Sequence, residues 1–274
     1  MPYPEGVDLS NNNGPVMLDA VAASGRVFVF MKATEGVAFR DSFFTQWWAS
    51  AKRLGLYRGA YHFGLPSKNS PEDEASFFMA IMQEQGIEPG DMLALDLEDP
   101  AAGGALNDWT LRFLERVEAL AGFAPIIYTS PGYAVDHLLA RSPELGRFPL
   151  WCASWGVSTP PQAPPPWDLV SFHQYGVGGP GSVPGVSGEC DLNRFNGLAE
   201  RIPLLGKPGT VAPLPPLDDA ISVAALQAQV DALKAQRDGL ISAVAYLADT
   251  VGDAHLALVK EAQRVRTEQV GPRP

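Results

Sequence analysis

Strand-like and helix-like segments alternate along most of this chain, and this alternation restricts the possible folds more than any other feature. Helix-like segments separate the first six strand-like runs, at about 15–23, 40–54, 71–86, 107–121 and 131–141. The strand-like runs are rich in β-branched and aromatic residues, and they cover 6–10, 27–34, 57–64, 92–98, 125–130, 149–155, 169–175 and 189–195. Because strands that alternate with helices pair in parallel, the pattern predicts an α/β protein with a parallel sheet.

The last two connections depart from this alternation. Residues 156–167 and 176–188 are rich in Pro and Gly and carry no helical pattern. The sequence therefore predicts five βα units followed by strands joined by loops, and eight strands favour closure into a barrel. An open doubly wound sheet is the alternative, but no glycine-rich phosphate fingerprint follows the first strand.

The strand-like run at 92–98 carries two acids on one face. Side chains alternate along a strand, so Leu93, Leu95 and Leu97 share one face while Asp96 and Glu98 share the other. We expect the leucines to face the helices, which places both acids inside the barrel or at its mouth. Barrels of this type carry their chemistry at the C-terminal strand ends, so the pair is predicted to act in acid–base catalysis. The alternative interpretation is a pair of solvated acids at a strand end.

Two further acids are expected at the same end of the barrel. Asp8 lies in the first strand and Asp191 in the eighth, and these strands become neighbours when the barrel closes. Each acid alone would be typical of a turn or a helix cap. The four histidines and two cysteines show no metal-ligand spacing, so we expect metal-free carboxylate catalysis; a divalent metal held by the carboxylates is the alternative.

Aromatic side chains occur at the same strand ends. They are Tyr61, Phe63, Tyr128, Trp151, Trp155, Phe172 and Tyr175. Aromatic residues in strands are usually part of the core, but flat rings beside carboxylates also suit a sugar-binding groove, where they stack on pyranose rings. Gln174 would supply an amide for sugar hydroxyls.

These motifs together resemble the family 25 glycoside hydrolases, the Chalaropsis-type lysozymes that are common as phage endolysins. The resemblance rests on GVDLS at 6–10, MKATEG at 31–36, GAYHF at 59–63, LDLE at 95–98, LWCA at 150–153, HQY at 173–175 and VPGVSGECDLN at 183–193. One departure is His173, where the family often has tryptophan. The family's fold is a modified TIM-like barrel of eight strands and five helices, which agrees with the segments counted above.

The resemblance implies hydrolysis of the β-1,4 bond between N-acetylmuramic acid and N-acetylglucosamine in peptidoglycan, without a cofactor. Glu98 would be the general acid, with its pKa raised by the charge of Asp96. Asp96 would stay ionised and stabilise the transition state, either directly or by orienting the acetamido group of the substrate. Asp8 and Asp191 would position water, substrate or the acid pair. The substrate-binding residues would be Lys32, Tyr61, Tyr128, Trp151 and Gln174.

The chain after the barrel has a different pattern. Residues 1–205 are expected to form the catalytic barrel, 206–217 a Pro- and Gly-rich linker, and 218–274 a long helix. From Val223 a heptad runs without a slip, with mostly Val at a and mostly Leu at d, which favours a parallel two-stranded coiled coil. We expect homo-oligomers through 222–268; the alternative is an amphipathic helix folded back on the barrel.

Charge and hydropathy exclude several functions. The net charge of −11 argues against nucleic-acid binding, and no apolar run is long enough to insert into a membrane. No signal peptide precedes the first strand, so we expect the protein in the host cytoplasm until lysis and then at the cell wall. The first hypothesis is an endolysin. The alternatives are a virion-associated structural protein anchored by its coiled coil, and a non-catalytic glycan-binding module, which would not need Glu98.

Overall fold

The computed structural model describes residues 2–138, 142–207, 234 and 237. Eight strands close into a barrel: β1 (Glu5–Leu9), β2 (Phe28–Glu35), β4 (Tyr57–Phe63), β5 (Met92–Asp96), β6 (Ile126–Thr129), β7 (Leu150–Ala153), β8 (Val170–Gly178) and β9 (Cys190–Phe195). Closure is made by pairing of β1 with both β2 and β9. The prediction of a closed eight-stranded barrel is therefore confirmed.

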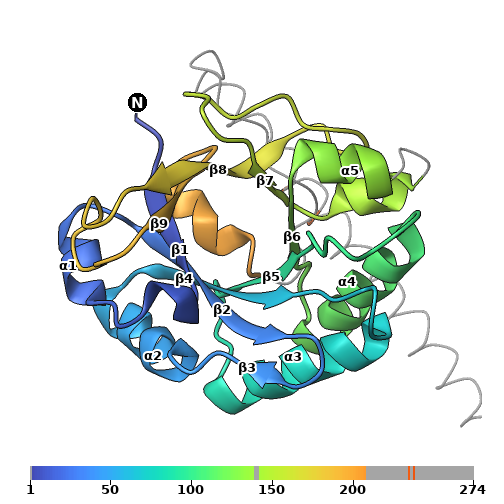
Figure 1. The fold of residues 1–274 in the computed structure, drawn as a ribbon, viewed down its shortest axis with the longest axis horizontal. Coiled ribbons are helices and arrows are strands. Elements are labelled where there is room, and N and C mark those ends of the chain that lie inside the picture. The colour runs from blue at the N-terminus through green and yellow to red at the C-terminus, as the bar shows by residue number, and fades with distance from the viewer. Residues whose placement is uncertain (1, 139–141, 208–233, 235–236, 238–274) are drawn as a thin grey trace, which may run out of the picture. The chain divides into compact units, whose positions relative to one another are not determined.

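Five α-helices lie around the outside of the strands (Figure 1). They are α1 (Leu18–Ala23), α2 (Phe44–Leu54), α3 (Pro71–Gln85), α4 (Asn107–Ala121) and α5 (Pro131–His137). Each follows the strand after which the sequence predicted it. Helix α2 begins later than expected, because Phe39–Arg40 forms a short strand, β3, that pairs back on β2. Three 3₁₀ segments were not predicted: η1 (Asn11–Asn13), η2 (Pro143–Arg147) and η3 (Ala199–Leu204).

The expectation of a wholly parallel sheet is wrong in one strand. Strand β9 runs antiparallel to both β8 and β1, so the barrel is mixed. A parallel partner needs a crossover of a dozen or more residues, usually a helix. The Pro- and Gly-rich connection between β8 and β9 contains no helix and returns the chain as a hairpin.

The strands separate two cores. Leu93, Leu95 and Leu97 belong to the large core between strands and helices, as predicted from their alternation. Ala94 belongs to a second core inside the barrel, which is filled mainly by aromatic rings from β2, β4 and β6 to β9. Aromatic packing is close there, for example between Phe30 and Trp151, whose ring centroids lie 4.2 Å apart.

Two features fill the barrel interior below its mouth. Gly6 and Gly59 leave room for phenylalanines of β2, because a Cβ on Gly59 would lie 2.2 Å from the Phe30 ring. Segment η3 then crosses the middle of the ring of strands (Figure 1), and Ile202 packs into the interior core. The N-terminal strand ends are thereby packed, and the C-terminal ends remain for a cleft.

Several sequence expectations concern residues that the structure does not describe. The linker at 206–217 and the helix at 218–274 lie outside the described residues, except for Gly206, Lys207, Lys234 and Arg237. The linker, the coiled coil and the domain boundaries therefore stay predictions. Within the described part of the chain, the helices are too short or too polar to cross a bilayer.

Candidate active site

A cleft of about 350 Å³ opens at the C-terminal ends of the barrel strands. Its lining residues are Asp8, Ser10, Asn12, Lys32, Tyr61, Phe63, Asp96, Glu98, Tyr128, Trp151, Trp155, Gln174 and Asp191. All nine site residues that the sequence predicted are among them. They come from eight different strands or strand ends, so the cleft exists only in the closed barrel.

The four acids meet as two pairs. Asp8 of β1 and Asp191 of β9 are directly opposite each other in the strand pairing. Asp96 ends β5 and Glu98 follows it on the same face. Asp96 is 7 % exposed, whereas Glu98 is exposed at the rim of the cleft. The cleft therefore has one acid below its surface and one within reach of a bound ligand.

The pKa values of the second pair are shifted by burial and by nearby charges. Burial and the nearby charge of Glu98 raise the pKa of Asp96 well above its ordinary value. Desolvation and the charge of Asp191 raise the pKa of Glu98, and Lys32 opposes that rise. Asp191 therefore adds to the effect of burial on the pKa of Glu98. Burial thus opposes the ionised form that the sequence analysis expects for Asp96, and the roles of the two acids stay a prediction.

Asp8 is held by two amides. Gln174 and Asn193 each donate from the side-chain nitrogen to Oδ2 of Asp8, at 3.0 and 2.6 Å. Burial and the charge of Asp191 raise the pKa of Asp8 to about 7, although these two hydrogen bonds oppose the rise. Asp8 therefore changes its charge near neutral pH, at the centre of the cleft.

Comparison of the sequence with protein-family models identifies the family. The sequence model of the glycosyl hydrolases family 25 matches residues 7–186. The chain belongs to glycosyl hydrolase family 25. It is an enzyme of the lysozyme or muramidase type in that family, whose substrate is peptidoglycan.

Individual relatives cover the same region. Lysozyme M1 of Streptomyces globisporus is 31 % identical over 212 residues, which span 72 % of this chain and 69 % of that protein. The bacterial lysozyme of Streptomyces coelicolor superposes with a TM-score of 0.67 at 29 % identity, covering 75 % of this chain and 98 % of that one. The CTP1L endolysin superposes with a TM-score of 0.59 at 30 % identity, covering 70 % of this chain and 66 % of that one.

In the family 25 enzyme, two buried acids hold the loops at the mouth. Glu74 accepts hydrogen bonds from the Leu65 backbone at 3.0 Å and from the Asn69 amide at 2.7 Å, and its Oε2 contacts Nε2 of His62 at 2.9 Å. Asp99, which follows Glu98, accepts from the Ser67 backbone and from its own loop. The loops after β4 and β5 are therefore tied down beside the general-acid candidate.

Lys32 contributes the positive charge in the lining. Its ammonium contacts Oε2 of Glu35 at 2.7 Å and lies 4.8 Å from the Phe63 ring centroid. Glu35 is one-third exposed, so the pair is partly solvated. Lys32 still lowers the pKa of Asp96 and Glu98, which keeps the acid pair from being fully neutral.

Sequence reasoning missed some of the cleft. Ser10 and Asn12 line it from the turn after β1, and Asn193 lies beside it through its bond to Asp8. Asn193 is two residues from Asp191 on β9, so strand alternation alone would have put the two on one face. Of the aromatic candidates, Phe172 lies in the barrel core and Tyr175 points outward, where its ring stacks on Arg194 at 3.8 Å.

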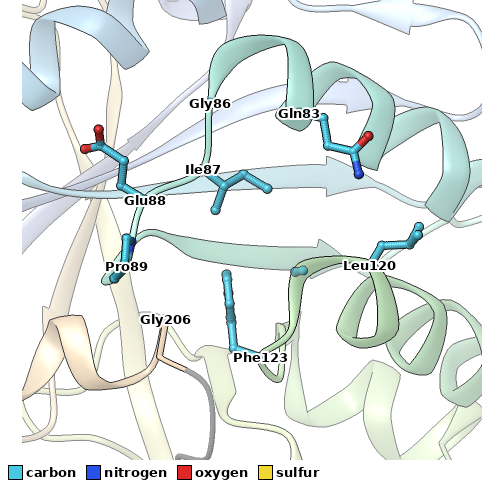
Figure 2. A pocket seen from close by; sticks show the side chains of 9 residues that line it. Gln83, Gly86, Ile87, Glu88, Pro89, Leu120, Phe123 and Gly206 are labelled. Atoms are coloured by element: carbon cyan, nitrogen blue, oxygen red, sulfur yellow. The ribbon is translucent and has the colours of Figure 1, made fainter.

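A second hollow lies at the opposite end of the strands, between the ends of α3 and α4 (Figure 2). Its lining is largely apolar, with Ile87, Leu120 and Phe123 among the residues shown. Its carboxylate, Glu88, pairs with Lys52 and Arg58 on the surface. One surface acid without an acidic partner in the lining does not provide the pair that glycoside hydrolysis needs, so the catalytic assignment stays with the acidic cleft.

Proposed function

We propose that this enzyme hydrolyses the β-1,4 bond between N-acetylmuramic acid and N-acetylglucosamine, with Glu98 as the general acid. The support is the position of Glu98: it is the exposed member of a carboxyl pair, and its raised pKa favours a proton ready for the leaving oxygen. The names of the relatives, which are lysozymes and muramidases, support the same bond.

The observation that carries the role of Asp96 is an unpartnered oxygen. Oδ1 of Asp96 is buried and accepts no hydrogen bond. Asp96 lines the cleft, and a substrate acetamido N–H that donates to its carboxylate would favour the ionised form. The proton of the pair would then reside on Glu98, where the leaving group needs it. Substrate binding would in this way prepare the acid, and Asp96 would orient the acetamido group or stabilise the cationic transition state directly.

Asp8 and Asp191 complete the proposed site from the other side of the cleft. Asp191 raises the pKa of both Asp8 and Glu98 by its charge. The two acids would position water or substrate, and Lys32, Tyr61, Tyr128, Trp151 and Gln174 would line the path of the glycan strand.

We also propose that the protein acts as an endolysin, held in the host cytoplasm until lysis and then acting on the cell wall. The likeness to the CTP1L endolysin supports this role. Recovery of the chain from purified virions would instead favour a virion-associated lysozyme.

The test is clearing of purified cell walls by wild type and by Glu98→Gln. This substitution keeps the shape of the side chain and removes the acid, so we expect the rate to fall by roughly 10²–10⁴-fold with little change in wall binding. Glu200→Gln is the matched control, because Glu200 is an exposed acid on η3 at the packed end of the barrel. Equal clearing by wild type and Glu98→Gln would remove Glu98 as the acid, and mass spectrometry of the reducing ends would identify the bond.

A further inference from the structure

The two amides that bind Asp8 are themselves held by tryptophans. Nε1 of Trp155 donates to Oε1 of Gln174 at 2.9 Å. Nε1 of Trp151 donates to Oδ1 of Asn193 at 2.8 Å. Each amide therefore lies between an indole and the same carboxylate oxygen, Oδ2 of Asp8.

The indoles decide which way each amide points. An indole N–H only donates, so the atom of Gln174 or Asn193 that faces it must be the oxygen. The nitrogen of each amide must then face Asp8. This orientation follows from the chemistry of the donors, because oxygen and nitrogen of an amide have nearly the same shape.

The bonds at Gln174 leave little freedom. Its Oε1 also accepts from the hydroxyl of Tyr128 at 3.0 Å, so the oxygen has two donors. Gln174 is 3 % exposed and Asn193 is fully buried. Trp155 differs from the rest of the network because its side chain is 58 % exposed at the rim of the cleft. A ligand in the cleft can therefore touch the network at Trp155.

We propose that Trp151 and Trp155 are positioning residues that lock the amides of Asn193 and Gln174, so that both donate to Oδ2 of Asp8 and only Oδ1 can carry a proton. The inference rests on the proposed function of the cleft, which gives Asp8 its place beside the acid pair. Two donors aimed at Oδ2 oppose a proton on that oxygen, and they fix the plane of the carboxyl group.

Charged and titratable groups face Asp8 from most strands of the barrel. They are Asp191 from β9, Asp96 and Glu98 from β5, Lys32 from β2, Tyr61 from β4 and Tyr128 from β6. The acids favour the neutral form of Asp8 and the locked amides favour the charged form, and the pKa of about 7 is consistent with this opposition. Removing the N–H of one indole should therefore change the pKa of Asp8, although the substitution alters no charged residue.

The test is Trp155→Phe, which keeps an aromatic ring at the rim and removes the N–H. Tyr128 can either donate or accept, so without the indole the Gln174 amide is free to rotate. Its oxygen can then accept a hydrogen bond from the protonated carboxyl of Asp8, and we expect the pKa of Asp8 to rise by about one. Selective ¹³C labelling of aspartate carboxyls in the full chain, assigned with Asp8→Asn, measures this pKa by NMR.

Trp167→Phe is the matched control. Its indole also donates to one acceptor, the backbone oxygen of Phe148 at 3.0 Å, but away from the cleft. We expect Trp167→Phe to lose stability and to leave the pKa of Asp8 unchanged. If Trp155 had only a structural role, Trp155→Phe would likewise lose stability and leave the pKa of Asp8 unchanged. An unchanged pKa of Asp8 in Trp155→Phe overturns the inference. The NMR titration needs no substrate, so its outcome is independent of whether the wild type clears cell walls.

Discussion

Replacing Asp8 by Asn should stabilise the barrel at neutral and alkaline pH. The native carboxyl is 8 % exposed and its pKa rises from 3.8 to about 7 on folding. Between these two pH values the folded chain holds a proton that the unfolded chain has released. Stability rises with pH only where the unfolded state binds more protons, so Asp8 makes the fold less stable as the pH increases over this range.

The magnitude follows from the two pKa values. One pKa unit corresponds to about 1.4 kcal/mol, and the linkage between pH 4.5 and pH 8 amounts to about 3 kcal/mol for such a group. Asn keeps an acceptor for the donors Gln174 and Asn193 and cannot ionise. The free energy of unfolding of Asp8→Asn, relative to wild type, should thus increase by about 3 kcal/mol from pH 4.5 to pH 8.

Urea denaturation followed by tryptophan fluorescence measures this difference. All six tryptophans lie in the barrel sequence, between Trp47 and Trp167, so the signal reports on the barrel and not on the C-terminal segment. The expected gain corresponds to a shift in the urea midpoint of roughly 1–2 M. Asp19→Asn is the control, because Asp19 is exposed and Arg53 lowers its pKa below the usual value, so the carboxyl is ionised in both states over this range and its stability difference should not change between the two pH values. A stability difference for Asp8→Asn that is the same at both pH values would refute the reasoning.

Two further predictions concern the rest of the chain. Glu74→Ala leaves the buried His62 and the Leu65 N–H without their hydrogen-bond partner. We expect this substitution to lower the free energy of unfolding by about 3 kcal/mol, measured by the same fluorescence assay. An unchanged urea midpoint would contradict the role given to Glu74. Light scattering should give the full chain a mass above that of a monomer and residues 1–205 the mass of a monomer, if 222–268 associates as its heptads predict. Equal, monomeric masses would rule out that association.

Local sequence patterns were sufficient for the eight barrel strands, the five α-helices and the facing of the acids. Alternation along β5 placed the leucines among the helices and Asp96 in the cleft, because side-chain direction in a strand depends only on position. Helix α3 begins at Pro71, as the proline and the acids after it indicate, with Ser70 as its N-cap. These features depend on neighbours in sequence, which a single chain displays directly.

Which acid carries the proton was not accessible in this way. The sequence reasoning assigned the charge that raises the pKa of Glu98 to Asp96, its neighbour in sequence. In the folded barrel the charge of Asp191 also raises the pKa of Glu98, and burial raises the pKa of Asp96 itself. Burial and through-space charge depend on distances between residues far apart in the chain, so a linear pattern cannot rank the four acids.

The sequence by itself determined the order of the eight barrel strands and five α-helices, the face on which each acid lies, and the family. The tertiary structure alone decided that β9 runs antiparallel and that its Asn193 joins Gln174 on a single oxygen of Asp8. The physical reason is the separation along the chain over which each effect acts. Secondary-structure propensity and side-chain alternation involve a few neighbouring residues, whereas barrel closure brings Asp8 to partners more than 160 residues away. The chemistry of the cleft arises from those long-range contacts.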